Sequence, residues 1–179
     1  MKRKILFILP LFLFTNVSFS APGNNDILSV SVNIIARDES LKLRFPNVNL
    51  EEYFITISLF NKQDTNVSFR VMTCSWAESF ITNNDSIFVI PQQCDSNFPE
   101  TIELEPGQSV IFFGKLRSRI KYRYPSPPPA FKVAFVDLPL NKFPLSELSL
   151  SVTEKKKFRA FWSNDILLEE KLGDYKIEN

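Results

Sequence analysis

The chain has 179 residues, 21 of them basic and 20 acidic, so its net charge is close to zero. This balance excludes a general nucleic-acid binder, whose surface is strongly basic, and it confines any anion-binding site to a local patch. Histidine is absent, which excludes Ser-His-Asp and Cys-His catalytic groups.

The first 20 residues have the features of an export signal. Lys2–Lys4 form a positive segment, residues 5–14 are an apolar run, and Ser20 ends a short stretch with small residues before the expected cleavage point. The apolar run is shorter than the roughly 20 residues that span a bilayer. We therefore expect a mature, periplasmic or extracellular chain of residues 21–179, forming a single domain with no transmembrane segment.

The mature part alternates between apolar and polar residues, which is typical of β-strands. The first alternating run covers 27–34. The runs 53–59 and 67–72 follow, and the turn-rich segment 61–66 between them predicts that they pair as a hairpin. Further strand-like runs lie at 86–90, 101–104, 109–114, 130–136, 150–152, 158–162 and 166–168.

Turn signals separate these runs. Asn83–Asp85 is a strong turn sequence, Pro91 ends a run, and Pro106–Gly107 predicts a turn with the glycine at positive φ. No segment carries a convincing ten-residue helical pattern. We count seven to nine strands, and we predict an all-β fold, an antiparallel immunoglobulin-like β-sandwich.

The two cysteines are Cys74 and Cys94. In an oxidising compartment an even pair is typical of a disulfide. Closing a loop of this length would stabilise the fold by roughly 3 kcal/mol. We predict a structural Cys74–Cys94 bridge.

Several short sequences resemble small bacterial secreted proteins with immunoglobulin-like β-sandwich domains. They are "MTCSW" and "CDSNFP", "TIELEPGQSVIFFGKL" with its strand–Pro-Gly–strand hairpin, and then "FKVAFV" and "WSND". The resemblance covers about residues 53–168 and implies the sandwich fold, but it brings no activity with it. A basic and proline-rich insert at 115–129 departs from the pattern.

Sequence motifs for catalysis are missing. The four glycines form no phosphate-binding loop. The adjacent carboxylates Glu51 and Glu52 point to opposite faces if they lie on a strand, so they are not placed as acid and base. Asn83–Asp85 lacks calcium-loop spacing. We expect no enzyme activity, no catalytic residue, no metal site and no cofactor.

The main functional candidate is a basic stripe of alternate residues: Lys115, Arg117, Arg119, Lys121 and Arg123. On a strand these side chains share one face. In one interpretation they are the solvated face of an edge strand, where basic residues discourage aggregation. In the other, the stripe and Tyr124 bind an acidic polysaccharide, an anionic lipid or an acidic protein surface.

The sequence thus favours an exported, non-catalytic binding or interaction module that engages an anionic partner and does not bind nucleic acid. Two other functions stay open. The chain could be a secreted inhibitor that presents residues 118–130 to an enzyme, or a structural envelope or adhesin subunit.

Overall fold

The structure, a computed structural model, describes residues 27–40, 50–90, 96–119, 130–138 and 150–168. It confirms an all-β fold: nearly all regular structure is antiparallel strand. The strands are β1 (Leu28–Asp38), β2 (Glu51–Asn61), β3 (Val67–Met72), β4 (Phe80–Thr82), β5 (Ile87–Ile90), β6 (Pro99–Leu104), β7 (Ser109–Ser118), β8 (Val133–Val136) and β9 (Ala160–Trp162).

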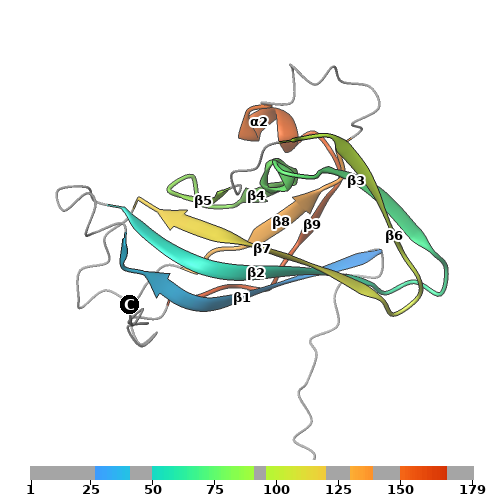
Figure 1. Cartoon of the computed structure of the whole chain (residues 1–179), viewed down its shortest axis with the longest axis horizontal. Coiled ribbons are helices and arrows are strands. Elements are labelled where there is room, and N and C mark those ends of the chain that lie inside the picture. Colours follow the sequence, from blue (N-terminus) through green and yellow to red (C-terminus); the bar gives the residue numbers. More distant parts are fainter. Residues whose placement is uncertain (1–26, 41–49, 91–95, 120–129, 139–149, 169–179) are drawn as a thin grey trace, which may run out of the picture.

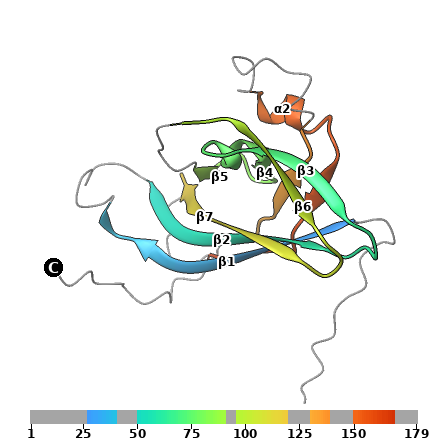
Figure 2. The same cartoon turned by 45° about the vertical axis from the view of Figure 1, so that its right-hand side comes forward.

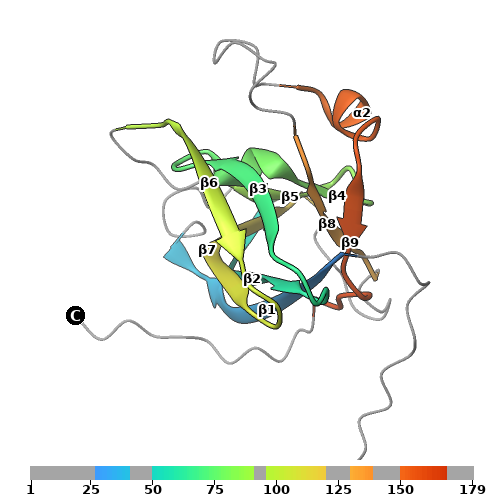
Figure 3. The same ribbon diagram turned by 90° about the vertical axis from the view of Figure 1, so that its right-hand side faces the viewer.

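The strands form three sheets. The large sheet has the order β1-β2-β7-β5, the two-stranded ribbon pairs β3 with β6, and the small sheet has the order β4-β8-β9. Figures 1 and 2 show the large sheet along one side of the molecule, and Figure 3 shows the ribbon crossing beside the small sheet.

One hydrophobic core joins the three sheets. Alternate residues of β2 point into it, and Ile57 and Leu59 are completely buried. Phe69 of the ribbon packs edge-on against Phe135 of the small sheet, with ring centroids 4.9 Å apart. The face of the large sheet that turns away from this core is called its outer face below.

Two short helical segments lie wholly within the described residues, a 3-10 turn η1 (Trp76–Ser79) and α2 (Val152–Lys155). Neither is long or apolar enough to cross a membrane. The prediction of a strand at 150–152 was wrong. Ser151 and Glu154 form a capping box, in which the Ser151 N–H and hydroxyl donate to the Glu154 carboxylate, and this arrangement starts a helix instead.

The central strand of the small sheet is buried on both faces. Every residue of β8 is buried. Val133 and Phe135 face the main core, whereas Ala134 and Val136 belong to a second apolar cluster that includes Phe158. Leu150 and Phe158, on either side of α2, therefore cover this face of the small sheet. The buried Lys155 of α2 forms an ion pair of 2.5 Å with Glu78 of η1.

The predicted hairpin between 53–59 and 67–72 was wrong. Both segments are strands, but β2 pairs with β1 and β7, whereas β3 pairs with β6. The chain leaves the large sheet after Asn61 because this residue organises the corner. Its buried side-chain amide donates to the carbonyls of Thr65, at 2.8 Å, and Leu104, at 3.0 Å, and its Oδ1 accepts from Gln63 N–H.

The connection from β6 to β7 passes through the same corner. The predicted turn at Pro106–Gly107 is confirmed, with Gly107 at φ 74° and the Gln108 N–H donating to the Glu105 carbonyl. However, the flanking strands β6 and β7 belong to different sheets, so this turn connects the ribbon to the large sheet and does not form a paired hairpin. Asn61 links this connection to the one from β2 to β3, because its backbone forms hydrogen bonds with both Gly107 and Gln108.

A close contact fixes η1 against the large sheet. Trp76 is buried and lies against Gly114 of β7, where a Cβ would come within 2.7 Å of its ring. The Trp76 ring also contacts Phe112, with centroids 5.1 Å apart. Only glycine at position 114 leaves room for the indole.

We predict that Asn61→Ala destabilises the fold by about 2 kcal/mol or more, because it leaves the carbonyls of Thr65 and Leu104 without this donor in a buried corner. Urea unfolding measures the change. Asn66→Ala, at an exposed position of the same connection, is the control and should change stability little. Equal effects of the two substitutions would contradict the role of the corner.

We also predict that Gly114→Ala costs about 1–3 kcal/mol in the free energy of unfolding, because the added methyl group displaces the Trp76 ring. The loss should be accompanied by a change in Trp76 fluorescence. Gly107→Ala, where no atom lies within 4 Å of the added Cβ, provides the comparison: its cost comes from backbone conformation alone and leaves the fluorescence unchanged.

Candidate functional site

The basic stripe begins on β7 as predicted. Lys115 and Arg117 alternate with the buried residues Leu116 and Ser118, so their side chains lie on the outer face of the large sheet. Arg119 follows directly after β7 and is exposed. Lys121, Arg123 and Tyr124 lie outside the described residues, so their part in a site stays a prediction.

The stripe does not begin on an edge strand. Residues 115–118 of β7 pair with β2 on one side and with Ile87–Ile90 of β5 on the other. The interpretation of these residues as the solvated margin of a sheet was therefore wrong. Sequence alternation identifies a strand, but it does not identify the strand's neighbours.

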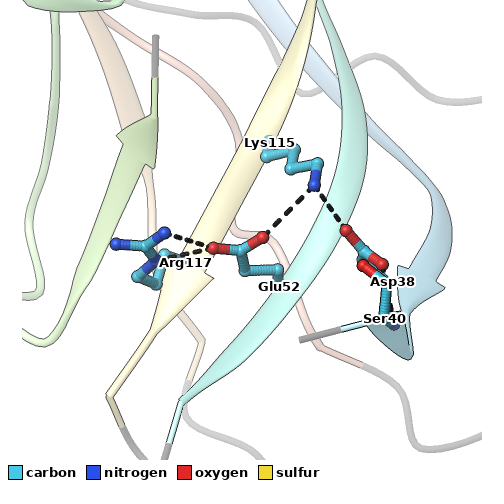
Figure 4. A network of polar contacts seen from close by, with 5 residues as sticks. All are labelled: Asp38, Ser40, Glu52, Lys115 and Arg117. Atoms are coloured by element: carbon cyan, nitrogen blue, oxygen red, sulfur yellow. Dashed lines mark hydrogen bonds and ion pairs between the residues drawn. The ribbon is translucent and has the colours of Figure 1, made fainter. Parts of the chain in front are cut away.

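Acidic residues from two neighbouring strands neutralise the first two cations. Lys115 forms ion pairs with Asp38 of β1 and, at 3.3 Å, with Glu52 of β2. The Arg117 Nε donates to the same Glu52 carboxylate at 2.7 Å, and its terminal NH2 group donates there as well. Figure 4 shows this charge network of Asp38, Glu52, Lys115 and Arg117 across three strands.

The two carboxylates are more buried than their cationic partners. The side chains of Asp38 and Glu52 are 6% and 5% exposed, whereas those of Lys115 and Arg117 are 35% and 32% exposed. A buried carboxylate needs a cation and hydrogen bonds to remain charged. Lys115 and Arg117 therefore serve first to compensate the sheet's own acidic residues.

The electrostatics of the network follow from these contacts. Burial by itself raises the pKa of Asp38, but hydrogen bonds from Lys115 and Ser40 outweigh it and hold the pKa below its ordinary value. Burial lowers the pKa of Lys115, but its bonds to Asp38 and Glu52 raise the pKa above the ordinary value. Both groups thus stay charged over the whole neutral range.

Arg119 is placed differently. Its guanidinium carbon lies 5.1 Å from the ring centroid of Phe88 on β5, a cation–π contact, and it makes no ion pair with any residue of the described ranges. Arg117 lies 5.9 Å from the same ring. Among the described cations of the stripe, Arg119 is the one that contacts an aromatic ring but no described carboxylate.

The outer face also carries exposed apolar side chains that the sequence analysis did not single out. Phe54 and Phe60 of β2 are 38% and 40% exposed, and Ile111 and Phe113 of β7 are 52% and 61% exposed. We call these four residues the apolar patch. They occupy alternate positions that are normally polar when a sheet face meets water. Their apolar character at these positions is the sequence feature from which the patch could have been predicted.

The register of β2 and β7 brings the patch together. Phe54 is opposite Lys115, which places Phe113 diagonally beside it, and Phe60 is opposite Ser109, which places Ile111 diagonally beside it. Diagonal neighbours on an antiparallel sheet are within reach of aromatic side chains. The patch adjoins the charge network directly, because Lys115 Nζ lies 4.9 Å from the Phe54 ring centroid.

Cys94 lies outside the described residues, so the Cys74–Cys94 disulfide stays a prediction. The surroundings of Cys74 are consistent with it. Asn97 Oδ1 accepts the backbone N–H groups of Cys74 and Ser75, and the Thr73 N–H donates to the Phe98 carbonyl. The segment after Cys94 is thereby held against the segment that carries Cys74.

The described ranges contain no cluster of three or more acidic, cysteine or histidine side chains that could hold a metal ion. The adjacent carboxylates also serve separate contacts. Glu51 accepts from the Tyr53 hydroxyl at 2.8 Å and pairs with Arg37, whereas Glu52 belongs to the charge network.

No family model matches the chain, and no curated protein matches it in sequence. Among solved structures, it is similar to the crystal structure of a FixG-related protein from Vibrio parahaemolyticus. The two are 14% identical, with a TM-score of 0.36, and the match covers 80% of this chain and 97% of that one. A likeness of this size transfers no function.

We predict that Asp38→Asn lowers stability at neutral pH by about 1 kcal/mol, a value reduced because Lys115 is partly exposed to water. The folded pKa of Asp38 is lowered, so its contribution is present above its ordinary value of 3.8 and is lost as the pH falls through the folded value. The difference from the native protein should shrink in acid. Denaturant unfolding at neutral and acidic pH measures it.

The control is Asp64→Asn, in an exposed turn without an ion pair among the described residues. It should change the free energy of unfolding little at either neutral or acidic pH. If the Asp38→Asn difference stays constant from neutral to acidic pH, the ionised Asp38–Lys115 pair is not its cause.

Proposed function

We propose that this chain is an exported, non-catalytic module with an immunoglobulin-like sandwich fold that binds an acidic protein surface through the outer face of its large sheet. The observation that carries the proposal is the apolar patch. Large apolar residues gathered on one exposed sheet face are typical of protein interaction sites. Phe113, the most exposed of the four, is the expected centre.

Charge complementarity supports an acidic partner. The charge network contains two acidic and two basic residues, so it is neutral. Beyond it the sequence from Arg119 to Val136 contains the basic residues of the stripe and no acidic residue. The sequence that follows the charge network is therefore basic, and this charge would attract and orient an acidic surface.

The patch favours a protein over the other anionic partners considered. Aromatic side chains are enriched at the centres of protein interfaces, with charged groups around them. A polysaccharide or a lipid headgroup would be bound mainly by uncompensated cations, but Lys115 and Arg117 are already paired with carboxylates. Arg119 then contributes orientation and salt dependence, and the patch contributes most of the affinity.

The alternative functions gain no specific support. An inhibitor would use residues 118–130, of which 120–129 lie outside the described ranges. A structural envelope or adhesin subunit would show assembly without a separate ligand. Export itself also stays a proposal, since residues 1–26 lie outside the described ranges.

We predict that residues 21–179 bind acidic peptides with interspersed aromatic residues on a peptide array, and that Phe113→Ser weakens this binding about tenfold or more, as the loss of an interface centre does. Arg119→Ser should weaken it by a smaller factor, about threefold, and reduce its dependence on salt. Phe98→Ser, at a 54% exposed phenylalanine outside the large sheet, is the matched control and should bind normally.

Acidic glycans and anionic vesicles are tested in parallel. Binding to either that requires Arg119 but not Phe113 would overturn the proposal in favour of a non-protein anion. No binding of any peptide by the folded native protein would also overturn it.

A further inference from the structure

Among the described residues, β1 is a border strand of the large sheet. It pairs with β2 along its whole length, and on its other side the described residues provide a single bridge, between Val30 and Ser163. Figures 1 and 2 show β1 at the border of the sheet. An edge strand presents a row of backbone donors and acceptors to which another strand can pair.

The central part of this edge lacks the usual protection. Residues 31–35, with the sequence SVNII, contain no charged residue and no proline. The irregularity in pairing falls only at the last of them, Ile35, which is skipped between Ile34 and Ala36, and the first charges come at Arg37 and Asp38. Edge strands that must stay single normally carry lysine, proline or an earlier bulge.

The core is also incomplete beside this edge. Val32 and Ile34 point toward the core side, opposite Ile57 and Ile55 of β2, which are 0% and 1% exposed. Val32 and Ile34 themselves are only partly buried. A further strand beside β1 with apolar residues at matching positions would complete their burial.

The sequence of β1 provides such a strand to itself. In an antiparallel pair of two copies centred on Asn33, Val32 lies opposite Ile34 of the other copy, and Ile34 lies opposite its Val32. Both contacts fall on the core side, and the two Asn33 side chains meet on the outer face, where Asn33 is exposed. No like charges meet in this register, and the contact obeys two-fold symmetry.

We propose that two copies of this chain associate through antiparallel pairing of residues 31–35 of β1, joining their large sheets into one continuous sheet. This association goes beyond the binding of an acidic partner and uses a different surface. The pairing is limited at one end by the Val30–Ser163 bridge and at the other by the bulge. The segment between these limits is centred on Asn33.

The test is the mass of residues 21–179 in solution, measured by sedimentation over a wide range of concentration. The native chain should sediment as a dimer. Asn33→Lys places two ammonium groups against each other at the symmetry axis, and it should give a folded monomer because position 33 is exposed. Ser68→Lys, at an exposed position of β3, is the matched control and should remain dimeric.

A mixture gives the sharpest result. Asn33→Asp alone should also be monomeric, but an equimolar mixture with Asn33→Lys should restore the dimer, because opposite charges then meet at the axis. A native chain that is monomeric at every concentration overturns the proposal. So does a dimer that survives Asn33→Lys, or a dimer that Phe113→Ser abolishes. Failure of peptide binding leaves these results unchanged, so the two proposals fail independently.

Discussion

The buried amide of Asn61 is the interaction on which the architecture depends. At this corner two connections pass between the large sheet and the ribbon, one from β2 to β3 and one from β6 to β7. Because both cross here, β3 and β6 pair with each other and face the large sheet across the core. A hydrogen-bonded side chain in a buried corner specifies this path, since apolar residues would bury equally well in a continuing hairpin.

The far end of the same strand is held by charge. Glu52, near the start of β2, accepts from Lys115 and Arg117, and Asp38 completes the contact from β1. The backbone register places Glu52 opposite both Arg117 and Asp38. Arg117 pairs with Glu52, and Lys115 pairs with both carboxylates. The network and the Asn61 corner thus fix opposite ends of β2, and the apolar patch lies between them.

The sequence predicted most strands, but not their partners. The run 67–72 matches β3 to the residue, and the basic stripe correctly implied that Lys115 and Arg117 share a face. The acidic partners could not be found, because Asp38 and Lys115 are 77 positions apart and no local pattern connects them. β4 was missed since all three of its residues, Phe80–Thr82, are buried, which removes the alternation. The predicted strand at 150–152 does not form because the Ser151–Glu154 capping box starts a helix there.

The ends of the described chain meet in space. Val30 of β1 bridges Ser163, and Phe131 bridges Ile166, while the core includes residues from Leu28 to Leu168. Pairings this distant in sequence form slowly, because the loops between them must close first. During synthesis β1 and β2 can meet early, but β7, the ribbon and the small sheet must all appear before the core closes. A growing chain therefore exposes apolar surface until its last strand is made. During this period the partly folded chain is prone to aggregation, although the finished fold buries the same surface.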